Sequence, residues 1–268
     1  MKLREALIDK LPEDVRLEVN TSFDTIGDIA ILEIDDELQE YQKVIAQTLL
    51  NLHTNIKVVV KKASEHEGTL RIQTYEHLAG EQRFETIAKE NGIELFLDIN
   101  KTYYSPRSQN ERLRVLNQVQ KGERVLVMFS GIAPFSIAIG KHTQASEVIG
   151  VELNEDACKY AQKNILRNKT SHVKQLQGDV REVVSKLGVF DRIIMPLPHS
   201  AAKYLDVARQ VASDNTIIHL YCFSTEENIH SYAQSLLQEK EVVKEIVQAG
   251  SYNPALKRWC IDILVKKS

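Results

Sequence analysis

The stretch that decides the fold is Val125-Leu-Val-Met-Phe-Ser-Gly-Ile-Ala-Pro-Phe-Ser-Ile137, taken together with Val148-Ile-Gly-Val-Glu-Leu-Asn154. The first apolar run ends in a turn of small residues and a helix-like segment, and the second ends in an acidic residue. This order is typical of a βαβ unit that holds a nucleotide-like ligand. The turn lets the backbone approach the ligand, and the carboxylate can accept hydrogen bonds from the ribose hydroxyls. The glycine signal is weak by itself, since GxGxxG is absent and only Gly131 remains.

Downstream of this unit, short apolar runs alternate with helical patterns. Strands separated by helices predict a mostly parallel sheet that is covered on both faces. Two final segments, 240–248 and 258–266, predict an antiparallel hairpin that closes one edge. The remaining predicted strands lie at 148–152, 173–176, 191–197, 216–223 and 259–265. The predicted fold class is therefore α/β and Rossmann-like.

The first hundred residues predict a separate α+β unit. Asn91-Gly92 is a strong hairpin signal between the extended segments 86–91 and 93–99. Other predicted elements are a helix over 1–19 with a break at Pro12, strands at 26–32, 58–60 and 70–75, and a helix over 37–51. We place the boundary near residue 100, which gives a small α+β domain at 1–100 and a Rossmann-like domain at 101–268.

Composition and charge exclude several classes of protein. The net charge is −3, so no global basic field indicates nucleic-acid binding, and any RNA contact must come from a local patch. The cysteines, Cys158, Cys222 and Cys260, share no metal-ligand spacing with the histidines, which predicts buried thiols in a reducing compartment and no metal. No apolar run approaches the roughly 18 residues that span a bilayer, and no signal-peptide core is present, so we expect a cytoplasmic protein without membrane contact.

Three predicted loops meet at the carboxyl ends of neighbouring strands, where open α/β sheets bind ligands. Acidic residues at the ends of the second and third strands fit S-adenosylmethionine better than NAD. Asp179 would accept from the adenine amine, although a helix N-cap is the alternative role for it. The candidate cofactor residues are Phe129, Gly131, Pro134, Phe135, Glu152, Asp179, Val180 and Pro196. Most methyltransferases of this fold carry an acidic residue where Val127 stands.

An ordered set of motifs resembles one family, the archaeal and eukaryotic tRNA (guanine-37, N1)-methyltransferases. The resemblance covers roughly residues 20 to 268. The motifs are Leu70-Arg71, Leu78-Ala-Gly-Glu81, Tyr104-Ser-Pro-Arg107, Asn110-Glu-Arg112, Met128-Phe-Ser-Gly-Ile-Ala-Pro-Phe-Ser136, Gly150-Val-Glu-Leu-Asn154, Gly178-Asp-Val-Arg-Glu182, Asp191-Arg-Ile-Ile-Met-Pro-Leu-Pro-His199 and Tyr204-Leu-Asp206. It implies a class I methyltransferase domain that uses S-adenosylmethionine and acts on the anticodon branch of tRNA.

The resemblance also implies roles for individual residues. Guanine N1 must lose a proton before it attacks a sulfonium methyl, and Glu111 matches the general base. Arg71 matches the cation that stabilises charge on guanine O6, and Arg107 positions the base or phosphates. The candidate RNA-binding residues are Arg107, Arg112, Arg114, Tyr104 and His199. The alternative is that these residues have no catalytic role: Glu111 and Arg112 would be an exposed pair on a helix, and Arg71 an ordinary surface residue of a strand.

Two exchanges, the missing acidic residue at Val127 and the proline at position 196, keep other functions open. Pro196 stands where the family usually has Asn, and proline supplies neither a side-chain amide nor an N–H. About 20 residues precede the similar region, too few for the extra N-terminal domain of many members. A wyosine-pathway enzyme, which transfers an aminocarboxypropyl group or methylates a tricyclic guanosine at the same position, is therefore an alternative. A non-catalytic tRNA-binding module is the third hypothesis.

Overall fold

The computed structural model describes residues 2–63, 72–253 and 255–266. Contacts divide the chain into two compact units. The first comprises Met1–Lys89 and Glu94–Pro106, and the second comprises Glu90–Ile93 and Arg107–Ser268. No helix within the described residues combines the length and the apolar character needed to cross a membrane.

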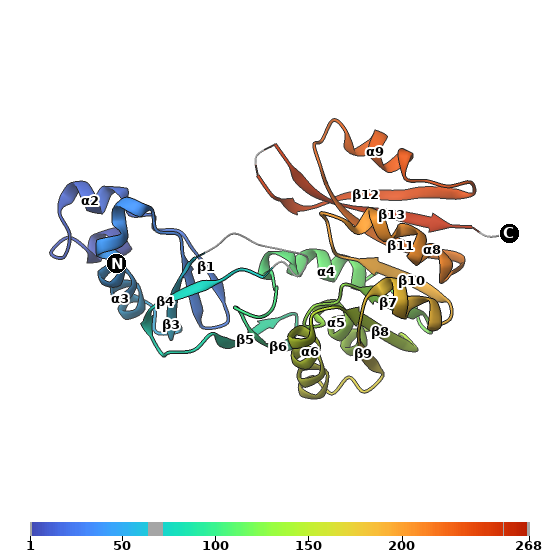
Figure 1. Cartoon of the computed structure of the whole chain (residues 1–268), viewed down its shortest axis with the longest axis horizontal. Coiled ribbons are helices and arrows are strands. Elements are labelled where there is room, and N and C mark those ends of the chain that lie inside the picture. The colour runs from blue at the N-terminus through green and yellow to red at the C-terminus, as the bar shows by residue number, and fades with distance from the viewer. Residues whose placement is uncertain (1, 64–71, 254, 267–268) are drawn as a thin grey trace. The chain divides into compact units, whose positions relative to one another are not determined.

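The first unit is a four-stranded mixed sheet with helices packed against it (Figure 1). The strand order is β1-β2-β3-β4, in which β2 and β3 run parallel and the outer pairs run antiparallel. Its elements are α1 (Leu3–Ala6), α2 (Glu13–Glu18), β1 (Phe23–Ile26), β2 (Ile29–Leu32), the 3-10 helix η1 (Asp36–Tyr41), α3 (Gln42–Leu52), β3 (Val58–Lys62) and β4 (Tyr75–Gly80). Buried Leu7, Ile45 and Leu49 belong to one apolar cluster between the helices and the sheet.

A hairpin, β5 (Glu85–Glu90) and β6 (Ile93–Asp98), follows this sheet. Its turn residues Asn91 and Gly92 both have positive φ, 44° and 75°, as a tight two-residue hairpin turn requires. The Asn91-Gly92 prediction is therefore confirmed. The predicted strand over 26–32 is instead two strands, because Gly27 turns the chain with φ 58°.

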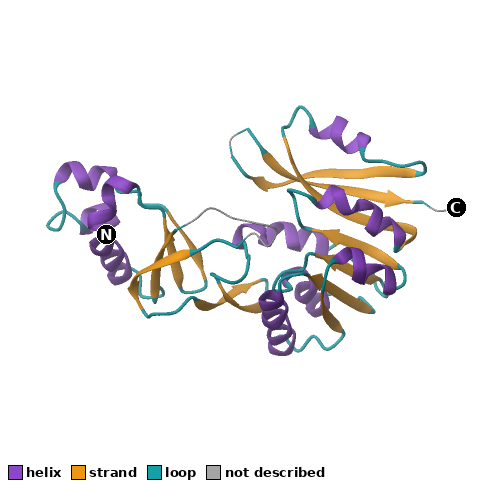
Figure 2. Cartoon of the chain, in the orientation of Figure 1, coloured by secondary structure: helices purple, strands orange, loops and turns teal. Residues whose placement is uncertain are grey.

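The second unit is built on a seven-stranded sheet with the order β12-β13-β11-β10-β7-β8-β9. The five strands from β11 to β9 run parallel, and helices alternate with them along the chain (Figure 2). Its elements are the 3-10 helix η2 (Pro106–Ser108), α4 (Gln109–Leu116), β7 (Arg124–Met128), α5 (Pro134–His142), β8 (Glu147–Glu152), α6 (Glu155–Arg167), β9 (Val173–Gln177), α7 (Val180–Val183), η3 (Val184–Lys186), β10 (Phe190–Met195), η4 (Ala201–Tyr204), α8 (Leu205–Gln210), β11 (Ala212–Ser224), α9 (Ile229–Ser235), β12 (Glu241–Ser251) and β13 (Lys257–Val265).

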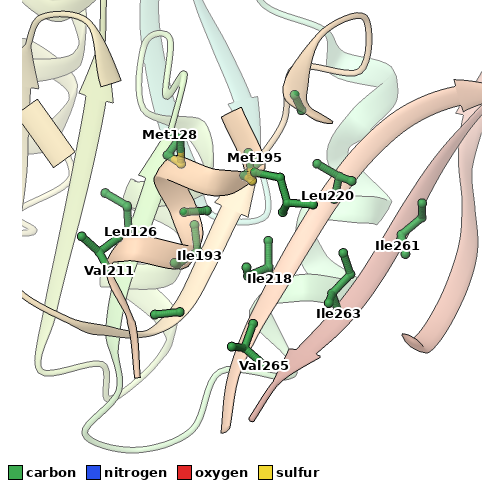
Figure 3. Packing of buried hydrophobic residues seen from close by; sticks show 14 of the residues in the cluster. Leu126, Met128, Ile193, Met195, Val211, Ile218, Leu220, Ile261, Ile263 and Val265 are labelled. Carbon is green, nitrogen blue, oxygen red and sulfur yellow. The ribbon is translucent and has the colours of Figure 1, made fainter. Parts of the chain in front are cut away.

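Both faces of this sheet are buried, as the continuous apolar runs predicted. Alternate residues point to opposite faces of a strand, so Leu126 and Met128 of β7 join one cluster while Val125 and Val127 join another. Figure 3 shows the first cluster, in which side chains from β7, β10, β11 and β13 pack together. The predicted parallel sheet and the closing antiparallel pair, β12 and β13, are both confirmed.

The strand predicted over 70–75 lies one strand-length too early. The structure begins β4 at Tyr75 and continues it to Gly80, and residues 70 and 71 lie outside the described part of the chain. Leu78 and Ala79 are the buried apolar residues of β4, and they lie outside the predicted segment.

Candidate active site

The loop between β7 and α5 lies at the point where ligands bind in sheets of this kind. β7 has β8 on one side and β10 on the other, so the chain crosses over in opposite directions from this strand. Phe129, Gly131 and Ala133 all have positive φ, at 56°, 56° and 69°. Alternation of backbone hand along a loop turns successive N–H groups toward a common side, which forms a concave site for polar groups. Pro134 then begins α5 at a position that suits its fixed φ.

Glu152 holds this loop in place from the end of β8. Its Oε2 accepts a hydrogen bond from the Gly131 N–H at 2.8 Å, and its Oε1 accepts from the Asn154 N–H at 2.8 Å. The side chain is only half-buried, and each oxygen retains a lone pair. The carboxylate can therefore accept a hydroxyl donor beside the loop backbone, and the structure brings Gly131 and Glu152 together as the sequence predicted.

Asp179 has a local role at the end of β9. Its side chain caps α7 by accepting from the Arg181 N–H at 2.9 Å, and it also pairs with the Arg181 guanidinium at 2.5 Å. These hydrogen bonds lower the pKa of the Asp179 carboxyl. The Arg181 guanidinium lies 5.6 Å from the centre of the Tyr204 ring, whose edge contacts Phe129 at 5.0 Å between ring centres. A cationic and aromatic wall thus connects the β7 loop to the end of β9.

The loop after β10 carries the departure at Pro196. The Leu197 N–H donates to the Met195 carbonyl at 2.9 Å, so the chain turns tightly around Pro196. Exposed His199 then contacts two other aromatic rings, Phe223 of β11 at 4.6 Å and Tyr252 at 5.7 Å between ring centres. These three rings form an aromatic cluster beside the loop, which the sequence did not predict because its members come from three separate segments.

Glu111 lies in the first turn of α4 and is 7% exposed. Arg114 holds it with two hydrogen bonds, from Nε to Oε2 and from Nη2 to Oε1, both at 2.9 Å. The Tyr221 hydroxyl donates to Oε1 at 2.7 Å, and the Tyr221 ring lies 6.2 Å from that of Phe135 in α5. Oε2 accepts one hydrogen bond and Oε1 accepts two, so Oε2 is the oxygen with capacity for a further proton donor.

Comparison with known proteins places this geometry in a family. The model of the TRM5/TYW2 methyltransferase domain matches residues 86–248, more than half of the chain. This chain belongs to the TRM5/TYW2 methyltransferase family. The model of the TYW2 N-terminal domain matches residues 3–83, so the similarity begins earlier than residue 20, where the sequence analysis placed it.

Individual relatives of the TRM5/TYW2 family cover most of the chain. The tRNA (guanine(37)-N(1))-methyltransferase Trm5b of Pyrococcus abyssi is 41% identical over 87% of this chain and 69% of its own length. The tRNA 4-demethylwyosine(37)-methyltransferase Taw21 of Saccharolobus solfataricus is 38% identical over 73% of this chain and 75% of its own length. A solved complex of aTrm5 with tRNALeu matches with a TM-score of 0.87 and 31% identity, over 99% of this chain and 78% of that chain.

Three predicted RNA-binding residues of this TRM5/TYW2 member occupy positions that do not fit surface contacts. Arg112 is 4% exposed and pairs with Glu90, with Nε donating to Oε1 at 2.6 Å. Arg114 is committed to Glu111 and Asp262. Tyr104 is 8% exposed and packed in the first unit. Both arginines have carboxylate partners that satisfy their charge, as burial of the Arg112–Glu90 pair requires.

The remaining predicted residues take varied positions. Exposed Arg107 belongs to the short 3-10 helix before α4, whereas Arg71 lies outside the described residues. Val180 and Phe135 are buried in the two apolar clusters of the second unit, one on each face of the sheet. Their buried side chains support the loop between β7 and α5 and the loop between β9 and α7.

The buried cysteines agree with the prediction of reduced thiols. All three are free, and burial raises the pKa of Cys158 to about 11 and that of Cys222 to about 12. Cys260 lies with His219 and Asp262 at a separation that a metal ion could bridge. Both ring nitrogens of His219 already have partners, Arg192 at 2.8 Å and Asp262 at 2.6 Å, so this trio is a hydrogen-bonded cluster.

His219 predicts a pH dependence of stability. Burial lowers its pKa below the ordinary 6.5, although Asp262 opposes this effect. Below pH 6.5 the unfolded chain therefore binds a proton that the folded chain does not, and the free energy of unfolding falls by up to about 1.4 kcal/mol per pH unit. Urea unfolding from pH 7 to pH 5 should show a shallower decline in His219→Asn, which keeps a donor toward Asp262. Parallel curves for the two proteins would contradict this prediction.

Proposed function

We infer that this chain transfers a methyl group from S-adenosylmethionine to N1 of guanosine 37 in tRNA. The observation that carries the chemistry is the position of Glu111. It is a buried carboxylate with spare capacity on Oε2, linked through Tyr221 and Phe135 to the helix that follows the β7 loop. The family supports the reaction class, and the relatives named above support the tRNA nucleotide.

The residues around the β7 loop fit the cofactor. Positive φ at Gly131 would let the backbone approach the cofactor, and the Glu152 carboxylate beside it would accept hydrogen bonds from the ribose hydroxyls. Half-buried Phe129 and Asp179, whose side chain caps α7, would line the adenine side. Bound S-adenosylmethionine supplies an electrophilic methyl group.

Residues of the chain then accept the guanine N1 proton and stabilise the negative charge that develops on the base. Glu111 accepts the N1 proton through Oε2 while Arg114 and Tyr221 keep the carboxylate in one orientation. The family resemblance supports a role for Arg71 as the cation at guanine O6, and exposed Arg107 would position the base or neighbouring phosphates. The aromatic cluster of His199, Phe223 and Tyr252 offers ring faces and edges to the anticodon branch. We place the reaction in the cytoplasm, in agreement with the buried thiols.

Methylation of a tricyclic guanosine derivative at the same nucleotide is the second candidate function. It is favoured by the 38% identity to the Saccharolobus solfataricus 4-demethylwyosine methyltransferase and by Pro196, which removes an amide side chain from the loop after β10. Aminocarboxypropyl transfer at the same nucleotide is the other wyosine-pathway reaction that the experiment must distinguish.

Nucleoside mass spectrometry separates these functions. We would incubate the protein and S-adenosylmethionine with unmodified transcripts carrying G37 or A37, and with tRNA that contains 4-demethylwyosine. N1-methylguanosine from the G37 transcript alone supports the leading proposal. Methylation of 4-demethylwyosine, or an aminocarboxypropyl adduct, would contradict the leading proposal and support the corresponding wyosine-pathway function. Cofactor binding without any product would indicate a tRNA-binding module.

Replacement of Glu152 tests the cofactor site. Glu152→Gln should weaken S-adenosylmethionine binding about 10- to 100-fold, because the amide removes one charged acceptor from Gly131 or Asn154 and from the ribose. Isothermal titration calorimetry measures the change, with Glu155→Gln as a control at an exposed position on the neighbouring helix. Equal affinities for the two variants would remove Glu152 from the site.

A further inference from the structure

A chain of buried polar side chains in the second unit leads to Glu111, and its members beyond Arg114 have no role in the reaction described above. It runs from Arg192 through His219 and Asp262 to Arg114, and it ends at Glu111. His219 and Asp262 are almost completely buried, with side chains 0% and 2% exposed. Burial of charged groups costs free energy unless every member of the chain has partners. We therefore ask what these buried groups do for Glu111, the residue at the end of the chain.

The hydrogen bonds fix the protonation of His219. A guanidinium only donates, so His219 Nε2, which lies 2.8 Å from Arg192 Nη1, must accept. The single ring proton then lies on Nδ1 and is donated to Asp262 Oδ1 at 2.6 Å. His219 is therefore a neutral donor to Asp262.

Asp262 is held as an anion. It accepts hydrogen bonds from His219, from Arg114 Nη1 at 2.8 Å, from Gln118 at 3.3 Å and from the Cys260 thiol at 3.2 Å. Burial alone would raise the pKa of Asp262, but the bonds from His219 and Arg114 outweigh it and hold the pKa well below its usual range.

Arg114 is consequently shared between two carboxylates. It donates to both oxygens of Glu111 and to both oxygens of Asp262, and it approaches exposed Glu245 at 3.4 Å. One positive charge thus faces two buried negative charges. Glu111 is firmly oriented by this guanidinium, yet its charge is only partly compensated.

We propose that Asp262 and Arg114 are positioning residues, in which Arg114 orients Glu111 and Asp262 draws enough of the Arg114 charge away for Glu111 to accept the guanine proton. The proposal rests on the proposed function, because it assigns a use to the base of that reaction. The titratable and charged groups that face Glu111 and Arg114 are Tyr221 and His219 of β11, Cys260 and Asp262 of β13 and Glu245 of β12.

The pH dependence of the single-turnover methylation rate on a G37 transcript tests this arrangement, with enzyme and cofactor in excess. Asp262→Asn leaves Arg114 to Glu111 alone, so the acid limb of the rate profile should move about one pH unit lower while the plateau rate falls about tenfold. Arg114→Gln removes the cation, so the acid limb should move about one pH unit higher. Displacement in opposite directions is the signature, since a merely structural loss would lower the rate at every pH.

Two further variants keep the test decisive if Asp262→Asn folds poorly. Arg114→Lys retains the positive charge but cannot donate to both Glu111 oxygens in one plane. The acid limb of the rate profile should therefore stay at the wild-type pH while the plateau rate falls. Glu245→Gln alters an exposed neighbour of Arg114, 57% exposed, and should leave the profile unchanged because solvent screens it. Acid limbs that move in the same direction, or not at all, while the wild type forms N1-methylguanosine, overturn the inference. A wild type that forms no such product contradicts the proposed function instead.

Discussion

Glu111→Gln should lower the single-turnover rate of N1-methylguanosine formation by about 10²- to 10⁴-fold, the usual contribution of a positioned general base. The amide cannot take the guanine proton, although it preserves the volume of the side chain and can still accept from Tyr221. Cofactor affinity should change by less than about threefold, because Glu111 lies on α4 and makes no bond to the β7 loop among its contacts. Rapid-quench kinetics and calorimetry measure the two quantities separately.

Tyr221→Phe is the matched control for this experiment. It removes one donor to Glu111 Oε1 but leaves Oε2 and the buried ring in place. We expect a loss of about tenfold, the value of one charged hydrogen bond. Equal losses of rate and cofactor affinity in Glu111→Gln would remove Glu111 as the base and make it a structural residue of α4.

Arg112→Met should destabilise the second unit by about 3–5 kcal/mol, the cost of leaving a buried charge without its partner. The Glu90 side chain that pairs with Arg112 is 1% exposed, so water cannot replace the guanidinium. The pair links the tight turn at Glu90–Ile93 to α4 within this unit. Urea unfolding followed by tryptophan fluorescence would measure the change, since Trp259 lies in β13 of the same unit.

The double variant Glu90→Gln with Arg112→Met is the control for that prediction. It removes both charges and should recover more than half of the lost stability, because no uncompensated charge remains. A single variant that is no less stable than the double would show that Glu90 finds another partner. A loss of tRNA affinity at unchanged stability would return Arg112 to the phosphate role that the sequence suggested.

The sequence predicted those parts of the fold that depend on local pattern. Apolar runs such as 148–152 and 216–223 predicted buried parallel strands, and Asn91-Gly92 predicted a hairpin turn through its backbone preference. Errors arose where a short turn was hidden in an apolar segment, as at Gly27, or where a strand began later than its signal, as at Tyr75.

The partners of the charged residues could not be predicted in the same way. Arg112 and Arg114 have the sequence signature of an exposed basic element, yet each faces a carboxylate supplied from another segment. Arg114 and Asp262 are 148 residues apart in the chain. Nothing local distinguishes a buried ion pair of this kind from a solvated one, because the distinction depends on tertiary packing. The order of motifs, in contrast, was sufficient to identify the family.

The place of β13 in the sheet has a consequence for how activity arises during folding. β13 pairs with β11 on one side and β12 on the other, and it contributes Asp262 to the residues around Arg114. The β7 loop and its anchor Glu152 need only the neighbouring parallel strands. A folding intermediate in which β13 has not yet inserted would therefore bind the methyl donor before it could use it. Cofactor binding and the orientation of the catalytic base thus depend on different strands of the same sheet.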